Sequence, residues 1–405
     1  MVSNMEYLRL SELTLNAVTG LDAIKRAPIV DEDTELKCIR IQDISQKKDY
    51  IDWGNTKVSV SDFKKTKLVK DDILVARTGA TVGVSYFVEE NLNAVFNNGT
   101  IRLRLDTKKI DPYLVYSLFQ TREFRTYIDN ISCVATQPNL RIKGLLRYMI
   151  PVFGKEIQKK ITLILFNYNK LIKNNNKRIK VLENIAEELY KEWFVRFRFP
   201  GFENITFKCE KPIGWIYGKN HNYDNIPITW KYSEFQNIGT FIRGKNITAC
   251  EMIEGEVPVI SAGLEPSGYH NNFNVTGPSV TISASGANAG YLSYHQENIW
   301  AADCSYYSNE DNLWFAYNTL KFLQPVITNM QVGSAQPHVY AKNINKLTVL
   351  IPDDNIINLY EAKVKPLYEE IKILTIENKN LIKQRDSLLP RLMSGKLSVE
   401  GKEII

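Results

Sequence analysis

The sequence predicts an α+β protein in which two similar β-rich domains are separated by an antiparallel pair of long coiled-coil helices, with a pseudo-two-fold internal repeat. Three observations predict this fold. Short motifs recur in the same order roughly 200 residues apart. A long segment with heptad spacing follows each copy, and the segments before it have strand composition broken by glycine, asparagine and aspartate. The predicted parts are 1–154 (first domain), 155–199 (first helix), 200–353 (second domain), 354–395 (second helix) and 396–405 (C-terminal tail).

Length and composition bound the class of protein. A chain of 405 residues is too long for one ordinary core, and 44% hydrophobic with 24% charged residues is typical of a soluble globular protein. Residues 1–12 have no apolar core of signal-peptide length, and no apolar run approaches the ~18 residues that a membrane span needs. The five cysteines are widely spaced with no Cys-x-x-Cys pair, which argues against a disulfide scaffold or a zinc cluster. A reduced cytosolic protein is expected.

The net charge of +6 is unevenly distributed. The excess of lysine and arginine lies in the first helical segment, whereas the second globular half is acidic overall. A solvated basic helix would give the same total, so charge alone is weak support for nucleic-acid binding.

Three motif pairs carry the internal repeat. They are TGATVG at 78–83 with SGANAG at 285–290, QPNL at 137–140 with QPHV at 336–339, and IP at 150–151 with IP at 351–352. Each pair alone could be a coincidence, but three pairs in the same order in both halves indicate a duplication.

Each half contains segments of strand composition and a helical segment. The strands are predicted at 73–76, 84–88 and 101–105 in the first half and at 279–283 and 347–351 in the second. The expected helices are 112–125 in the first domain and a weaker counterpart at 313–327 in the second.

Both long helical segments have apolar residues at alternating steps of three and four. The first seam comprises Leu165, Tyr168, Ile172, Asn175, Ile179, Leu182, Ala186, Leu189 and Trp193. The second comprises Val364, Leu367, Ile371, Leu374, Asn378, Leu381, Arg385, Leu388 and Leu392. Each helix could instead lie on its own domain, but two matched seams on one chain favour pairing with each other.

The direction of pairing is open from connectivity alone, because the second domain could bridge a parallel or an antiparallel pair. If each helix leaves an equivalent domain in the same local way, antiparallel pairing relates the domains by a pseudo-two-fold axis. The polar seam residues Asn175, Asn378 and Arg385 are expected to fix the register.

The helix boundaries also follow from the sequence. Residues 156–194 are expected to form one helix of ~58 Å, followed by a strand over 195–199 that ends at the Pro200-Gly201 turn. Pro366 should kink the second helix or start it afresh, and Pro390 and Gly395 should end it.

The repeated loops supply the candidate site. Their glycines permit tight turns and a close approach to another surface, although they could equally shape hairpins, and a Gln-Pro loop could simply cap a domain. Glutamine and asparagine can pair bidentately with adenine and arginine with guanine, while serine, threonine and lysine suit phosphates. The candidate residues are Arg77, Thr78, Gly79, Thr81, Gln137, Asn139, Arg141, Lys143, Arg243, Lys245, Ser283, Ser285, Asn288, Gln336 and His338, with Gly83 and Gly290 completing the turns.

Catalytic signals are weak throughout. Residues 239–246 imitate a phosphate-binding loop, but Asn246 stands where a Ser or Thr should hold Mg²⁺. Asp31, Asp33 and the segment 35–37 faintly resemble a metal-dependent nuclease. No Asn-Pro-Pro-aromatic or Asp-Pro-Pro-aromatic motif occurs, and the four histidines lack metal-ligand spacing. Neither catalysis nor a metal site is therefore expected in this chain.

Taken together, the chain resembles the specificity (S) subunit of type I restriction–modification enzymes over nearly its whole length. The resemblance rests on LYKEWFV at 189–195 and LLPRLMSGKL at 388–397, which close the two helices, with support from IRIQDIS at 39–45 and from 290–303.

The resemblance implies two target-recognition domains, each reading half of a split sequence in double-stranded DNA, with the helices setting the unread spacer. It implies that the helices dock two DNA adenine-methyltransferase subunits and that restriction subunits add ATP-driven translocation and cleavage, in defence against phage. S-adenosylmethionine, ATP and Mg²⁺ would then belong to partner subunits, with no cofactor in this chain. Two other hypotheses are a nuclease or NTPase acting alone and a coiled-coil scaffold without DNA readout.

Overall fold

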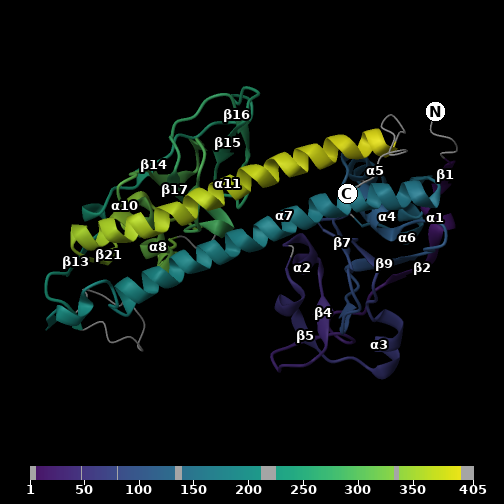
Figure 1. Ribbon diagram of the computed structural model, residues 1–405, viewed down its shortest axis with the longest axis horizontal. Helices are drawn as coiled ribbons and strands as arrows, with labels where there is room; N and C mark the ends of the chain where they lie inside the picture. Colours follow the sequence, from purple (N-terminus) through teal and green to yellow (C-terminus); the bar gives the residue numbers. More distant parts are fainter. Residues whose placement is uncertain are drawn as a thin grey trace. The chain divides into compact units, whose positions relative to one another are not determined.

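The computed structural model describes residues 6–46, 48–79, 81–132, 139–210, 225–332 and 337–393. The chain divides into two compact units: Met1–Asn174 with Asn378–Ile405 (unit 1), and Asn175–Glu377 (unit 2). Each unit combines one β-rich domain with part of each of the two long helices, α7 (Lys155–Tyr190) and α11 (Asp354–Met393), drawn in teal and yellow in Figure 1. In the part of the chain that is described, no helix is both long and apolar enough to cross a membrane.

Two four-stranded sheets form the domain of unit 1. The first has the order β2-β9-β6-β7 and is antiparallel throughout; its strands are Thr14–Thr19, Thr100–Leu105, Ile73–Ala76 and Ser85–Phe87. The second has the order β3-β5-β4-β8, with strands Ile29–Val30, Gly54–Thr56, Lys37–Ile39 and Ala94–Phe96. In this second sheet β4 and β8 run parallel. All four residues of β6 are buried, as the unbroken apolar run Ile-Leu-Val-Ala requires.

Short helices and one more strand pair complete unit 1. The helices are α1 (Leu10–Leu13), α2 (Ile41–Ser45), η1 (Tyr50–Asp52), α3 (Val60–Thr66), α4 (Pro112–Leu118), α5 (Arg122–Ser132) and α6 (Ile142–Leu145). Strand β1 (Glu6–Arg9) pairs with β10 (Met149–Val152), which leads into α7. Asp111 caps α4 by accepting a hydrogen bond from the Tyr113 amide, with Pro112 in the first turn.

The domain of unit 2 has a similar arrangement, with one strand fewer in its second sheet. Its antiparallel sheet has the order β14-β20-β17-β18, with strands Ile242–Arg243, Cys304–Tyr307, Ser279–Ser283 and Leu292–His295. Its second sheet has the order β16-β15-β19 (Gly268–His270, Val257–Ile260, Trp300–Ala301), again with one parallel pair, β15 with β19. Strand β13 (Lys231–Glu234) pairs with β21 (Thr348–Ile351), which leads into α11 as β10 leads into α7.

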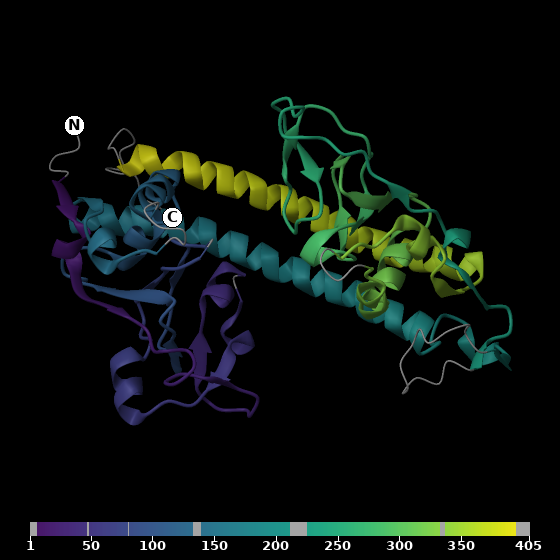
Figure 2. The same ribbon diagram turned by 180° about the vertical axis from the view of Figure 1, so that it is seen from behind.

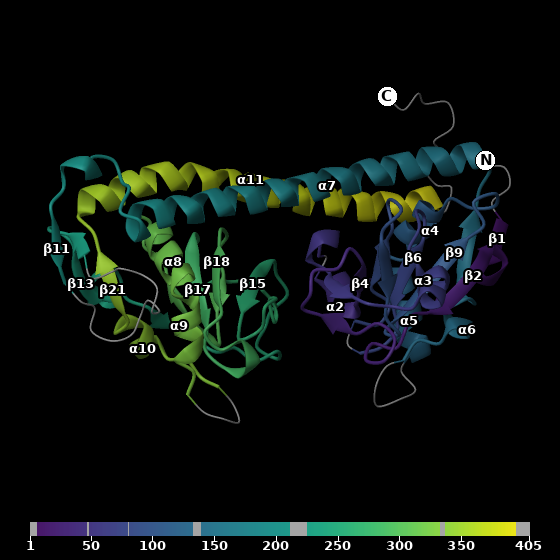
Figure 3. The ribbon, with the colours of Figure 1, turned by 90° about the horizontal axis from the view of Figure 1, so that it is seen from below.

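The helices of the two domains also correspond. Unit 2 contains η4 (Phe235–Asn237), η5 (Gly286–Asn288), α8 (Leu313–Phe322), α9 (Gln324–Asn329) and α10 (Ala341–Asn345). Figure 3 shows α8 beside β17. It also has η3 (Phe202–Asn204) and the pair β11–β12 (Phe207–Cys209, Asn225–Pro227). The pairs α4–α5 and α8–α9 occupy equivalent places after β9 and β20. The duplication in the sequence is therefore a duplication of topology.

Within each unit the two long helices run antiparallel. In unit 1 the Arg385 guanidinium donates to Asn169 Oδ1 at 2.7 Å, and Leu165 shares a core with Leu389 and Leu392. Higher residue numbers on α7 thus lie beside lower residue numbers on α11, so the two helices point in opposite directions.

Unit 2 has the same helix direction. Asn175 Nδ2 donates to Glu377 Oε2 at 3.1 Å, Arg178 pairs with Glu370 at 2.7 Å, and the Tyr360 hydroxyl donates to the Ala186 carbonyl at 3.1 Å. The antiparallel alternative is thus the one observed, and α7 and α11 can be followed from behind in Figure 2. Every residue of the two predicted seams is buried or half-buried.

Two expectations about the second helix are wrong: that it starts afresh at Pro366 and that it ends at Pro390. Helix α11 runs through both Pro366 and Pro390 to Met393, so neither proline starts or ends a helix. Both side chains are exposed, so a carbonyl that loses its intrahelical partner can be hydrated instead. Gly395 lies outside the described residues.

The predicted strand over 195–199 is absent. Helix α7 instead passes into a π-helical turn, η2 (Lys191–Val195), and Phe197 has a positive φ of 57°. Trp193, Phe194, Phe197 and Phe199 all enter the core of unit 2. The apolar alternation therefore reflects a compact reversal of the chain, which buries these rings, rather than a pleated strand. The expected helix 112–125 and its counterpart are likewise each split in two, at residues 119–121 and at Leu323.

A buried charged cluster ties the sheet of unit 1 to its neighbours. Asp72 is fully buried and accepts two hydrogen bonds of 2.8 Å from Arg104. The Arg102 guanidinium, on the same strand, donates to the Lys65 and Lys67 carbonyls at the end of α3 and to Asn16 Oδ1 at 2.7 Å. Because Asp72 and Arg102 are buried, the hydrogen bonds that they make are needed to offset their desolvation.

Candidate nucleic-acid interface

The first repeated motif forms the same turn in both domains. In unit 1, Gly79 and Gly83 have φ of 80° and 88°, and the Gly83 amide donates to the Ala76 carbonyl at 2.9 Å. In unit 2, Gly286 and Gly290 have φ of 74° and 83°, and the Gly290 amide donates to the Ser283 carbonyl at 2.8 Å. An L side chain in this left-handed region costs about 1 kcal/mol, which explains glycine at all four positions.

The two glycines of each turn have different surroundings. A Cβ at Gly83 would lie 2.9 Å from Ile128, and one at Gly290 would lie 3.3 Å from Ile327, so the second glycine packs against a helix. A Cβ at Gly79 or Gly286 would meet nothing within 4 Å. The first glycine of each turn therefore leaves open space beside the backbone.

The second repeated motif meets the first in both domains. Thr78 forms an antiparallel bridge with Asn139, and Ser285 forms one with His338. One equivalent backbone hydrogen bond supports each bridge: the Leu140 amide donates to the Arg77 carbonyl at 2.7 Å, and the Val339 amide donates to the Ala284 carbonyl at 3.0 Å. The two loops, which the sequence showed only as separate candidates, thus form one paired-loop site in each domain.

In unit 1 this paired-loop site carries polar and basic side chains. Arg77 Nη2 donates to Asn139 Oδ1 at 3.2 Å, which orients both side chains. Thr78, Gly79 and Thr81 are half-buried. Arg141 and Lys143 are exposed on the adjoining segment. Gln137 lies outside the described residues.

In unit 2 the site is organised by Asp303, which the sequence analysis missed. One carboxylate oxygen of Asp303 accepts a hydrogen bond from Ser285 Oγ, and the other pairs with the Arg243 guanidinium. No motif marks this aspartate, because its partners come from two other segments of the chain. Arg243 is therefore not a free cation but part of a pair at the surface.

The other candidates in unit 2 have distinct surroundings. Ser283 and Asn288 both donate to the Ala262 carbonyl, at 3.2 and 3.3 Å, so their side chains brace the turn. Lys245 is exposed, while its amide donates to the Ala301 carbonyl at 2.9 Å. His338 is half-buried, and Gln336 lies outside the described residues.

The phosphate-loop-like segment 239–246 does not fold as a strand, loop and helix. The phosphate-loop-like segment contains β14 and then irregular chain without a following helix. No group of three or more His, Cys, Asp and Glu side chains among the described residues could hold a metal ion. Burial lowers the pKa of His295 to about 4, and the ring shares a 2.8 Å hydrogen bond with Thr281 Oγ1, so this histidine is a neutral structural group at physiological pH.

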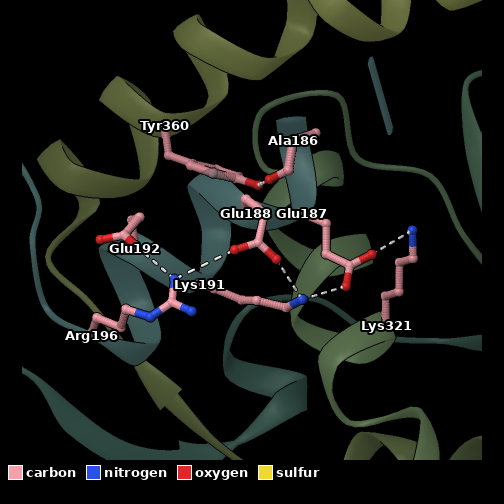
Figure 4. A network of polar contacts seen from close by, with 8 residues as sticks. All are labelled: Ala186, Glu187, Glu188, Lys191, Glu192, Arg196, Lys321 and Tyr360. Atoms are coloured by element: carbon pink, nitrogen blue, oxygen red, sulfur yellow. Dashed lines mark hydrogen bonds and ion pairs between the residues drawn. The ribbon is translucent and has the colours of Figure 1, made fainter. Parts of the chain in front are cut away.

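A polar network surrounds the end of α7 in unit 2 (Figure 4). Lys191 Nζ pairs with Glu187 at 2.7 Å and with Glu188 at 2.9 Å, and Lys321 of α8 pairs with the other oxygen of Glu187 at 3.0 Å. Burial raises the pKa of Glu187, but hydrogen bonds from the two lysines outweigh it, so its pKa is lowered overall. The network thus ties the segment that closes α7 to α8.

The fold and the sites together define a class of protein. Two equivalent domains each present a paired-loop site of arginine, asparagine, serine, threonine or histidine side chains, which are the groups that hydrogen-bond to bases and phosphates. Chemically, such a repeated site is suited to contacts with DNA.

Comparison with known proteins agrees. The family model described as type I restriction modification DNA specificity domain matches residues 23–184 and 227–384. The chain therefore belongs to the family of type I restriction–modification specificity subunits, and the resemblance seen in the sequence is confirmed.

Individual relatives cover most of the chain. It is 30% identical over 313 residues to the type I restriction enzyme MjaIX specificity subunit of Methanocaldococcus jannaschii, covering 72% of this chain and 70% of that one. It is 23% identical to the HindI specificity subunit of Haemophilus influenzae, with 82% and 88% covered. The S subunit of a type I restriction–modification system from M. genitalium has the same fold, with a TM-score of 0.55 at 18% identity over 96% of both chains.

Proposed function

We propose that this specificity subunit reads a bipartite DNA target, with one half-site contacted by the paired-loop site of each domain. The observation that carries the proposal is the repetition of that site, with the same turn, bridge and backbone hydrogen bonds in both domains. Two equivalent readers on one chain suit a target of two separate parts.

The side chains suggest how each half-site is contacted. In the first domain Arg77 and Asn139 are oriented by each other, and such groups pair bidentately with guanine and adenine. Arg141 and Lys143 are exposed beside them. In the second domain the exposed Lys245 and the Arg243–Asp303 pair carry groups that suit phosphates or bases.

The long helices are proposed to dock two adenine-methyltransferase subunits. Each helix carries exposed apolar residues in addition to its buried seam, among them Leu163 and Val181 on α7 and Ile373 and Ile382 on α11. Such residues suit a partner helix. In this proposal the chain itself is non-catalytic and acts in the prokaryotic cytoplasm. The partner methyltransferase and restriction subunits hold S-adenosylmethionine, ATP and Mg²⁺.

The test is to map methylated adenines by long-read sequencing in cells that carry the methyltransferase subunits with and without this chain. The proposal expects a bipartite motif that depends on the chain, and an Asn139→Ala variant that relaxes one half of the motif and leaves the other unchanged. Lys64→Ala, at an exposed position of α3, serves as the control. Methylation that is identical without the chain would refute the proposal.

The two other hypotheses have their own outcomes. Cleavage or nucleotide hydrolysis by the purified chain with DNA, Mg²⁺ and ATP would favour an enzyme acting alone. A chain that joins the methyltransferase subunits without salt-dependent, sequence-selective DNA binding would be a scaffold.

A further inference from the structure

In unit 2, three side chains stack on the second repeated loop. The rings of His338 and Tyr340 lie 6.0 Å apart at 13° to each other, and Lys342 Nζ lies 5.5 Å from the centre of the Tyr340 ring. Tyr340 has an extended backbone (φ −98°, ψ 142°), and its neighbour Val339 is 1% exposed in the core. Because successive side chains of an extended segment point to opposite sides, Tyr340 faces away from the core.

Tyr340 is an exposed aromatic residue that its own domain does not bury. Its side chain is 48% exposed, and its hydroxyl makes no hydrogen bond to the residues that the structure describes. The imidazole of His338 and the ammonium group of Lys342 lie beside its ring. A tyrosine has only two side-chain torsions, so it loses little conformational entropy when it contacts a partner.

The same positions in unit 1 carry different chemistry. The internal repeat aligns Asn139 with His338, Arg141 with Tyr340 and Lys143 with Lys342. The last position is an exposed lysine in both domains, whereas the middle position is an exposed arginine in one and an exposed tyrosine in the other. A basic group common to both readers suits the phosphate backbone, which is the same in both half-sites. A residue that differs suits the bases, which need not be the same.

We propose that Tyr340 is a specificity-determining residue that contacts a base in the half-site read by the second domain, as Arg141 does in the first. This inference rests on the proposed function. Lys342 contacts the adjoining phosphate, and the bridge between Ser285 and His338 fixes the loop against the Gly286 turn. The tyrosine can use its ring edge against a thymine methyl group or its hydroxyl as donor or acceptor to a base edge.

The test uses the chain assembled with its methyltransferase subunits and a DNA library in which every base of both half-sites is varied. Sequencing the methylated molecules gives the preference at each base pair. Tyr340→Ala is expected to relax the preference by about ten-fold at one or two base pairs of one half-site and to leave the other half-site unchanged. Arg141→Ala is expected to do the same in the opposite half-site.

Matched variants separate the contributions. Tyr340→Phe keeps the ring and removes the hydroxyl, so relaxation by both variants assigns the contact to the hydroxyl, and relaxation by Tyr340→Ala alone assigns it to the ring. Tyr269→Ala removes another exposed aromatic residue of the same domain, 57% exposed on β16, and should leave the preferences unchanged. Lys342→Ala should weaken binding to all sequences alike. It should also reduce the slope of log affinity against log salt concentration by about one.

The outcomes are distinct. If Tyr340→Ala methylates the library with unchanged preferences at every base of both half-sites, the inference is wrong. If that variant does not fold, as judged by its thermal unfolding, Tyr340→Phe and Tyr340→Arg decide, and unchanged preferences in both would overturn it. A wild-type complex that shows no bipartite motif would instead refute the proposed function itself.

Discussion

The carboxyl group of Glu361 makes the stability of unit 2 dependent on pH. It lies on α11 with 7% of the residue exposed, and its Oε1 accepts a hydrogen bond of 2.7 Å from the Phe315 amide in the first turn of α8. Its Oε2 has no partner among the described residues. Burial raises its pKa from the ordinary 4.5 to about 7, against the backbone hydrogen bonds of Phe315 and Trp314 and the charge of Lys365, which lower it.

The sign of the effect follows from proton linkage. Between pH 4.5 and about 7 the folded protein holds a proton on Glu361 that the unfolded chain has released, so stability falls as the pH rises through this range. The free energy of unfolding falls by ~1.4 kcal/mol for each pH unit in this range, so the total loss is about 3 kcal/mol and is complete above pH 7. Glu361→Gln keeps an oxygen for the Phe315 amide and removes the ionisation, so it should gain about 3 kcal/mol over the wild type between pH 4.5 and 8.

Urea denaturation of both proteins at half-unit steps of pH, followed by tryptophan fluorescence, measures this difference. Glu369→Gln, at an exposed position of the same helix, controls for the loss of one negative charge. A difference between Glu361→Gln and the wild type that stays constant from pH 4.5 to 8 would refute the reasoning. So would a wild type that becomes less stable relative to the variant as the pH falls.

Three further predictions concern the fold and the spacing of the half-sites. Arg102→Met should lower the free energy of unfolding, measured by urea denaturation, by about 3 kcal/mol, because it leaves buried acceptors unpaired. Arg147→Met, at an exposed site, is the control and should change it little. Gly83→Ala should destabilise by more than the ~1 kcal/mol expected of Gly286→Ala, since both have a positive φ but only Gly83 is close to a helix; equal losses in thermal unfolding would contradict this. Seven residues added to each long helix should lengthen the unread spacer of the methylated motif by about 3 base pairs, and an unchanged spacer would speak against the helices as its determinant.

The parts of the fold that were predictable are those whose pattern is local. Heptad spacing identified both helices because burial repeats with the helical period, and all seam residues from Leu165 to Leu392 are buried or half-buried. The strands at 73–76 and 279–283 were identifiable as short apolar runs bounded by turn residues. The helix boundaries predicted at Pro366 and Pro390 were wrong because the free-energy cost of a proline in a helix depends on whether the freed carbonyl can reach water. The sequence does not show which face of α11 carries these prolines.

The candidate site was only partly predictable, because its assembly is not local. Arg77 and Asn139 are 62 positions apart, and no pattern along the chain reports that their loops pair. Asp303 was missed for the same reason, since only the fold brings it to Ser285 and Arg243. Tyr340 was missed because an aromatic residue in a sequence is ordinarily assigned to the core.

The composition of unit 1 has a consequence for the order in which the protein matures on the ribosome. Its core joins Ile161 and Leu165 to Leu389 and Leu392, which are synthesised more than 200 residues later. While the second domain is being synthesised, this apolar surface of the nascent first domain stays exposed and can bind chaperones. A premature stop near the end of the message would therefore damage the N-terminal reader, although every residue of that domain had already been translated.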